Sequence, residues 1–301
     1  MRQKRGNMGL LDGLGDLGLG NLEGVSLFED KKEEDNKKEE VKKEEVVIKE
    51  EDFLYDKTFE CPVCGNKFKQ RMIRAGKAKL VSQDRDLRPM YEHIDVAKYD
   101  VILCSSCGYA VLPRFYGSLP KTYRDLIRKN ISTKFTNPNL SGSVITYDQA
   151  LTRYKMALLN AVVRHGKNSE KAYICMKTAW LLRNMQDDIE KKKIPESEKL
   201  KDLTLYRTQE KEYLKNAREG FLKARTEEVP PYAAGPGSEK GLNTATLDYL
   251  IGILGFETET AEAESYRILQ EVVNSSQATK FQKENASDVI VILKEKIHSE
   301  G

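Results

Sequence analysis

Four of the five cysteines in this 301-residue chain form two CxxC pairs, and this pattern constrains the fold more than any other feature. The first pair is Cys61 and Cys64, the second is Cys104 and Cys107, and a glycine follows each pair. A CxxC turn brings two thiolates to one side of a tight loop, where the glycine permits a positive φ angle. Four thiolates in a tetrahedral arrangement suit Zn²⁺. We therefore predict that Cys61, Cys64, Cys104 and Cys107 hold a structural zinc ion.

Two other chemistries fit these cysteines less well. Iron in a rubredoxin-type site uses the same tetrahedral set of sulfurs. A redox-active pair would need a thiolate at the start of a helix, and no convincing helix follows either pair. The fifth cysteine, Cys175, lies at helical spacing among apolar residues and is expected to fill the core. An odd number of cysteines, mostly in CxxC pairs, indicates a reducing compartment rather than a disulfide framework.

Composition and hydropathy indicate a cytoplasmic protein. Hydrophobic residues make up 39% of the chain and charged residues 32%, which is typical of a water-soluble protein with a modest core. No apolar run approaches the ~20 residues of a membrane span. The N-terminus begins with basic residues but lacks the apolar stretch of a signal peptide. We therefore expect no membrane partner.

Charge is distributed unevenly along the chain. Residues 1–58 carry 11 Lys/Arg and 16 Asp/Glu, a net charge of −5. Residues 59–135 carry 15 and 7, a net charge of +8, and residues 136–301 carry 24 of each. The part of the chain that contains the CxxC pairs is therefore the basic part.

Residues 1–58 are predicted to be a disordered low-complexity tail. Within it, residues 31–51 are dense in Lys and Glu and offer little apolar surface to offset the entropy lost on ordering. The preceding leucine and glycine repeats, LLDGLGDLGLGNLEG, are either a short docking motif or flexible low-complexity sequence.

Residues 59–120 are predicted to form a zinc-ribbon-like domain, followed by a connector over 121–145. Short segments rich in β-forming residues, 68–73 and 99–103, are the expected strands. So small a unit needs a metal, and zinc-driven folding of such peptides supplies roughly 10–16 kcal/mol of apparent binding free energy. We expect this ribbon and the helical half to have separate cores.

The segment between the two cysteine pairs contains a cluster of polar residues. Asp84, Asp86, Arg88 and His93 could form a catalytic site. Alternatively, aspartate–arginine hydrogen bonds hold a loop together. The second interpretation is favoured, because carboxylates beside arginines stay ionised and make poor general acids.

Residues 146–298 are predicted to be helical. Thr146 and Gln149 form a capping-box signature, and Gly166 at the C′ position is expected to end that first helix. Further helices are expected over 169–189, 195–225, 244–254, 260–274 and 278–297. Gly255 is expected to end the fourth of the six helices.

Two of these helices share a pattern of small, large and small side chains 45 residues apart: Ala172, Met176 and Ala179, then Ala217, Phe221 and Ala224. This pattern resembles the second helix of a tetratricopeptide unit, although the usual period is 34 residues. An ordinary helical bundle is the alternative. The predicted fold is therefore mainly α, with a small β zinc-ribbon-like module and a C-terminal tetratricopeptide-like helical array.

The chain also resembles a known family. The motifs CPVCG, DRDLRPMYEHIDVAKYDVILCSSCGYA and YLIGILGF are similar to the bacterial domain-of-unknown-function family 2225 over about residues 55–275. The similarity is most specific from Asp84 to Ala110. It implies a zinc-ribbon-like front and a tetratricopeptide-like back, and it implies no activity.

Three functions are considered for such a chain. Because it lacks the nucleotide-binding, metalloprotease and nucleophile-elbow motifs, we expect a non-enzymatic, zinc-binding interaction or scaffold protein whose helical surface holds an unidentified protein or peptide. The first alternative is nucleic-acid binding through the basic ribbon, where Lys67, Lys69 and Arg71 surround Phe68. The second alternative is an enzyme that uses the cluster around Asp84 to His93.

Overall fold

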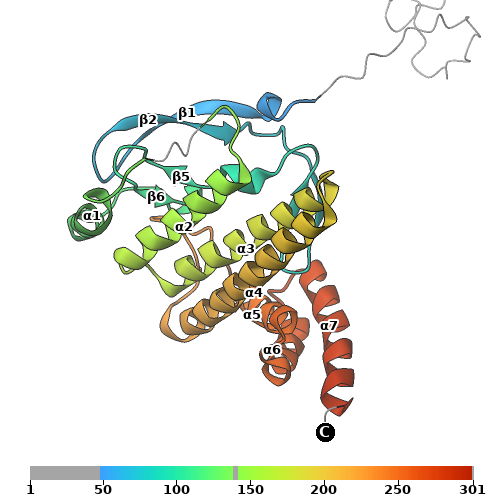
Figure 1. Cartoon of the computed structure of the whole chain (residues 1–301). Coiled ribbons are helices and arrows are strands. Elements are labelled where there is room, and N and C mark those ends of the chain that lie inside the picture. The colour runs from blue at the N-terminus through green and yellow to red at the C-terminus, as the bar shows by residue number, and fades with distance from the viewer. Residues whose placement is uncertain (1–47, 138–141, 300–301) are drawn as a thin grey trace, which may run out of the picture. The chain divides into compact units, whose positions relative to one another are not determined.

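Small antiparallel sheets and packed helices make up the part of the chain that our computed structural model describes, residues 48–137 and 142–299 (Figure 1). Each sheet has two strands, and the three sheets are β1 (Leu54–Glu60) with β2 (Lys67–Ile73), β3 (Leu80–Gln83) with β4 (Pro89–Tyr91), and β5 (Ile102–Leu103) with β6 (Ala110–Val111). Residues 1–47 of the expected tail lie outside the described residues.

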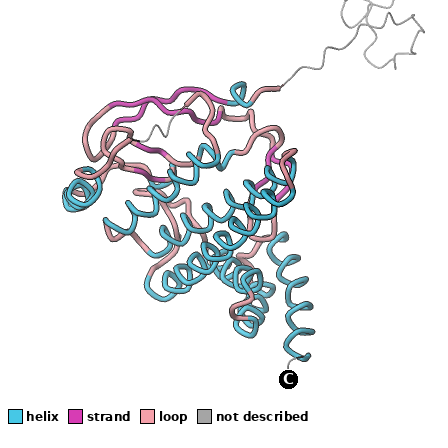
Figure 2. The backbone as a smooth tube through the Cα atoms, in the orientation of Figure 1, coloured by secondary structure: helices cyan, strands magenta, loops and turns pink. Residues whose placement is uncertain are grey.

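Helices follow the strands and form the larger part of the fold (Figure 2). They are α1 (Lys121–Ile127), α2 (Tyr147–Val163), α3 (Asn168–Lys191), α4 (Glu196–Glu227), α5 (Thr244–Thr258), α6 (Glu262–Asn274) and α7 (Lys280–Ser299). The mainly α fold with a small β module is therefore confirmed. None of the described helices has the length and apolar character needed to cross a membrane.

The end of the expected tail is ordered. Residues Glu50–Phe53 form a 3-10 turn that leads directly into β1. Phe53 and Leu54 are buried in the core, so this stretch gains apolar contacts that the charged sequence before it cannot make. The prediction of disorder up to residue 58 is wrong over residues 48–58.

The start of α2 confirms the capping-box prediction, and its end differs in one residue. The Thr146 side chain accepts a hydrogen bond from the Gln149 amide, and the Gln149 side chain accepts one from the Thr146 amide. His165, rather than Gly166, takes the left-handed conformation with φ 56°. Gly166 lies one residue later, where its N–H donates to the carbonyl of Ala161 at 2.7 Å.

Gly255 does not end its helix, because its role is to let two helices approach. α5 continues to Thr258, and Glu259 takes the left-handed conformation with φ 55°. A Cβ at position 255 would lie 2.1 Å from the Ser265 Oγ on α6, and one at Gly252 would lie 2.6 Å from Leu269. Both glycines thus permit the close crossing of α5 and α6.

The expected separate cores are wrong: one hydrophobic core joins the cysteine-containing strands to the first helices of the helical half. It contains Cys61 and Val111 from the strand region, and Tyr154 on α2 and Leu182 on α3. A second core, around Phe221, packs α3 to α7 together. Apart from the end of the tail at residue 58, the boundaries proposed for the segments stay a prediction.

A buried glutamine links the first sheet to the third. The Gln70 side chain on β2 donates to the Val101 carbonyl at 2.7 Å and accepts from the Leu103 amide at 3.0 Å. It thus satisfies backbone groups that a neighbouring strand would otherwise satisfy. The predicted strand 68–73 is confirmed as part of β2, but of the predicted strand 99–103 only β5 (Ile102–Leu103) forms, because Tyr99 ends the 3-10 helix Val96–Tyr99.

Small side chains allow α3 and α4 to pack closely. A Cβ at Gly220 on α4 would lie 2.9 Å from the Ala172 Cβ on α3. Ala172, Ala217 and Ala224, which belong to the repeated sequence pattern, are all buried in the second core. The pattern therefore marks helix contacts, while a tetratricopeptide-like array stays a prediction.

Candidate metal centre

The four sulfurs of the CxxC pairs lie close together. All of them are within 4.8 Å of one another. The Sγ atoms of Cys61 and Cys107 are 3.5 Å apart, and those of Cys64 and Cys104 are 3.7 Å apart. Sulfurs bound to one tetrahedral zinc at about 2.3 Å would lie about 3.8 Å apart. The set can therefore hold a single metal ion.

The two CxxC turns have the same backbone geometry. Gly65 donates its N–H to the Cys61 carbonyl at 2.8 Å, and Gly108 donates to the Cys104 carbonyl at 3.0 Å. Both glycines have positive φ angles, 76° and 72°. In each turn, the N–H of the first cysteine also donates to the carbonyl two residues after the second, at 2.9 and 2.8 Å. The sequence prediction of two matched metal-binding turns agrees with this geometry.

Because these sulfurs are mostly buried and contact one another, ionising one thiol makes it harder to ionise its neighbours. Cys61, Cys104 and Cys107 are buried, whereas Cys64 is exposed. Hydrogen bonds from the thiols of Cys107 and Cys61 lower the pKa of Cys104. Hydrogen bonding to Cys104 correspondingly raises the pKa of Cys61 and Cys107. A bound divalent cation would allow all four to be thiolates at once.

Contacts from later in the chain hold each turn in place. Arg128, which opens the π-helical turn Arg128–Ser132, donates from Nε to the Val63 carbonyl in the first turn at 3.0 Å. The buried Asn160 on α2 donates to the Gly108 carbonyl in the second turn at 2.9 Å. The candidate metal centre is thus anchored to later segments of the chain by two side chains that no sequence motif points to.

The second candidate cluster is a structural network rather than an open site. Asp86 is fully buried, and its Oδ2 accepts a hydrogen bond from the Trp180 indole at 3.0 Å. Arg88 donates from Nε to Asp84 at 2.6 Å. His93 lies apart from these three residues, with its side chain about half exposed and close to Glu92. These contacts agree with the predicted loop held by aspartate–arginine bonds.

Arg183 on α3 is the centre of this network, and sequence reasoning missed it. Its guanidinium contacts carboxylates from three parts of the chain: Asp84 at 3.2 Å, Asp86 at 3.0 Å, Glu210 at 2.7 Å and Glu257 at 3.5 Å. Burial raises the pKa of Asp86. Burial, together with the nearby Asp86 carboxylate, raises the pKa of Glu257 to about 8. No local spacing connects these residues, so only the fold reveals their association.

Comparison with known proteins places most of the described residues in one family. Residues 54–297 match the sequence model of a family described as "Uncharacterized protein conserved in bacteria (DUF2225)". The chain belongs to this family. No curated protein and no solved structure matches it. The match runs from the start of β1 into α7, which confirms the resemblance inferred from the motifs.

The two turn glycines should differ in their tolerance of alanine. At Gly65 a Cβ would meet no atom within 4 Å, whereas at Gly108 it would lie 2.6 Å from the Phe135 ring. We expect Gly65→Ala to cost about 1–2 kcal/mol through backbone strain alone, and Gly108→Ala to cost at least about 1 kcal/mol more through the clash. Urea unfolding of both metal-loaded variants measures this difference, and equal losses would contradict it.

Cys61→Ser should weaken the metal centre and the first core together. We expect the variant to lose metal on dialysis against a chelator, and amides in β1, β2 and α2 to exchange hydrogen faster, because all three elements share one core. Hydrogen exchange with mass spectrometry measures this. Cys175→Ser is the matched control, since Cys175 is buried in the second core and should keep the metal. Faster exchange confined to the strands would instead indicate separate cores.

Glu257→Gln should stabilise the protein only at high pH. The pKa of Glu257 is raised from 4.5 to about 8, so the favourable contribution of its protonated form is lost as pH rises between these values. We expect a gain of about 1 kcal/mol or more at pH 9 and little gain at pH 5. Thermal unfolding at both pH values tests this. Glu259→Gln, an exposed residue paired with Lys211, should give no gain at pH 9.

Proposed function

We propose that this protein is a zinc-binding interaction protein whose helical surface holds a basic segment of a partner protein. The observation that carries the proposal is an acidic groove between residues 89–95 and the helices α2, α3 and α4. Zinc is favoured over iron because the four thiolates hold the ion in a closed structural role that needs no redox chemistry. A reducing cytoplasm would keep these thiols available for the metal.

Two adjoining cavities form the groove. Their volumes are about 280 and 300 Å³, and both are lined by Tyr147 and Asp188. The groove has more carboxylates than amino groups. The carboxylates are Asp95, Asp148, Asp187, Asp188, Glu198 and Asp202, and the amino groups are Lys191 and Lys192. Part of this charge is paired within the protein, since Asp187 contacts Arg88 at 3.1 Å and Lys192 contacts Asp188 at 2.8 Å. The remaining charge is negative and complements a basic partner.

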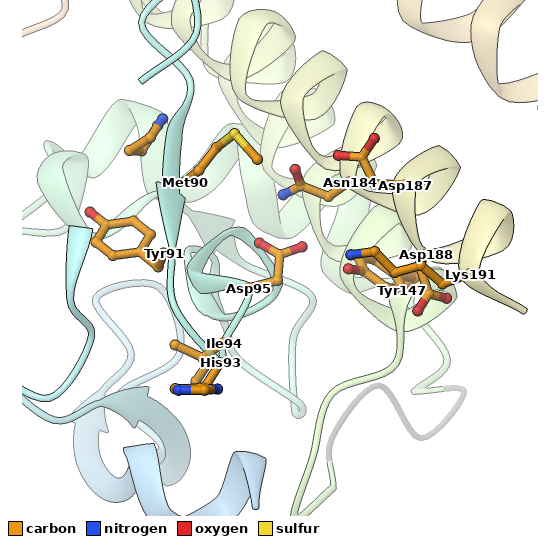
Figure 3. Close-up of a pocket in the computed structure, with 11 residues that line it drawn as sticks. Met90, Tyr91, His93, Ile94, Asp95, Tyr147, Asn184, Asp187, Asp188 and Lys191 are labelled. Carbon is orange, nitrogen blue, oxygen red and sulfur yellow. The ribbon is translucent and has the colours of Figure 1, made fainter. Parts of the chain in front are cut away.

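Asp95 places a carboxylate at the wall of the first cavity. Its Oδ1 accepts from the Ala97 amide at 2.9 Å, and its carboxylate also interacts with the Asn184 and Tyr147 side chains. Figure 3 shows the Asp95 carboxylate facing Asn184 and Tyr147 across the cavity. Burial raises the pKa of Asp95. A lysine or arginine side chain from a partner would add a charge-assisted hydrogen bond and favour the ionised carboxylate.

Aromatic rings in the groove favour the same kind of partner. Tyr147 lines both cavities and Tyr206 lines the second. Lys98 already lies 5.3 Å from the centroid of the Tyr147 ring, so cations do pack against aromatic faces in this region. Stacked helix pairs such as α3 and α4 are the type of scaffold that presents peptide-binding surfaces in tetratricopeptide-like arrays.

The two alternatives have weaker support. Nucleic-acid binding rests on exposed lysines of the β1–β2 hairpin such as Lys67 and Lys69, but Arg71 beside them is paired with Asp56 at 3.5 Å. An enzyme that uses Asp86 would need substrate access to a side chain that is fully buried.

A labelled decapeptide of alternating lysine and alanine should bind the groove. We expect Asp95→Asn to weaken binding about fivefold, because it removes the buried acceptor charge, and Asp202→Lys to weaken it by a similar factor through repulsion. Fluorescence anisotropy measures the affinity.

Asp288→Lys, an exposed site on α7, makes the same change in net charge as Asp202→Lys and should leave affinity unchanged. Equal losses in the two lysine variants would mean that binding is nonspecific and would contradict the proposal. A single-stranded RNA decamer that bound while the peptide did not would favour the nucleic-acid alternative.

A further inference from the structure

Arg153 on α2 is a buried cation without a counterion. Arg153 is only 2% exposed to solvent. Its Nε and Nη1 atoms are buried and have no hydrogen-bond partner. Burial lowers the pKa of this guanidinium to about 10, and the only opposing influences come from two tyrosines, Tyr154 and Tyr99. A buried, unpaired charge of this kind opposes folding unless something else satisfies it.

The other buried cations show that this arrangement is exceptional within the described residues. Five Lys and Arg residues are buried there, and four of them contact a carboxylate. Lys98 contacts Glu50 at 2.7 Å, and Lys177 contacts Asp100 at 2.7 Å. The fold therefore supplies a partner for each buried cation except Arg153.

Arg153 lines a cavity whose other groups also suit an anion. The cavity has a volume of about 90 Å³ and lies between β2, the second CxxC turn and α2. Lys69 and Arg71 on β2 line it, together with Ser105 from the turn between Cys104 and Cys107. Asp56 also lines the cavity and offsets part of the charge through its 3.5 Å contact with Arg71. Three cations and one carboxylate leave a net positive cavity.

We propose that this cavity binds a phosphate group of a small anion, with Arg153 as its central ligand. A guanidinium offers a planar fork of donors that matches two oxygens of a phosphate, and such charge-assisted bonds are the strongest type of protein hydrogen bond. Lys69 and Arg71 add positive charge at the cavity, and the Ser105 hydroxyl is a further donor. The small volume suits one phosphate group and excludes a bulky ligand.

This location would let the anion support the same junction as the metal. Ser105 belongs to the second CxxC turn, whereas Arg153 belongs to α2. A phosphate held by both would bridge the strand region and the helical half. This bridge would add to the existing hydrogen bond between Asn160 and the Gly108 carbonyl. Anion binding should therefore raise the stability of the whole described unit rather than of one loop.

The experiment is thermal unfolding of the metal-loaded protein in inorganic phosphate from 0 to about 20 mM, with chloride used to hold ionic strength constant. The wild type should show a saturable rise of about 3 °C or more. Arg153→Met should be at least as stable as the wild type without phosphate, because it removes a buried unpaired charge, and should show no saturable rise. A wild type without a saturable response, or an Arg153→Met variant with an unchanged response, would overturn the proposal.

Two further variants keep the test decisive if Arg153→Met does not fold. Lys69→Gln changes an exposed side chain at the cavity and should weaken phosphate binding severalfold by calorimetry. Lys129→Gln removes the same charge at an exposed site away from the cavity and should leave binding unchanged. Equal effects of the two would overturn the assignment of this cavity. The assignment to a small anion would also be overturned if an RNA decamer displaced phosphate and bound more tightly than phosphate does. The bound phosphate group would then come from a nucleic-acid backbone.

Discussion

The close approach of four cysteine sulfurs, whose mutual repulsion as thiolates one bound cation would relieve, is the constraint on which the rest of this structure depends. Sulfurs 3.5 and 3.7 Å apart cannot all be thiolates without a compensating positive charge. The strands that carry them form only two-stranded sheets, which are marginally stable by themselves. A metal bound by all four sulfurs would contribute roughly 10–16 kcal/mol in a comparable peptide, more than these sheets can supply.

The metal centre also connects to the helices rather than standing as a separate module. Asn160 and Arg128 bind the carbonyls of the two CxxC turns, and Gln70 joins β2 to the segment that leads into the second turn. One hydrophobic core then continues from Cys61 to Leu182 on α3. If these sulfurs hold an ion, its loss would therefore lower the stability of α2 and α3 as well as of the strands. The unpaired charge of Arg153 lies at the same junction, where a second ligand could add to this linkage.

Local signals in the sequence predicted the local features well. The CxxC spacing and its following glycines predicted the geometry of both cysteine turns, and the Thr146 capping box predicted the start of α2, because each depends on residues a few positions apart. Features that depend on distant contacts were missed. Gly255 was interpreted as a helix end, but the approach of Ser265 on α6 explains it. Neither the contact of Trp180 with Asp86 nor the separation of His93 from Asp86 could be inferred from spacing.

X-ray absorption spectroscopy at the metal edge, on protein purified without added metal, tests the central claim most directly. The account predicts one zinc per chain with four sulfur ligands at about 2.3 Å. Substoichiometric metal, or a first shell that contains nitrogen or oxygen ligands, would contradict it.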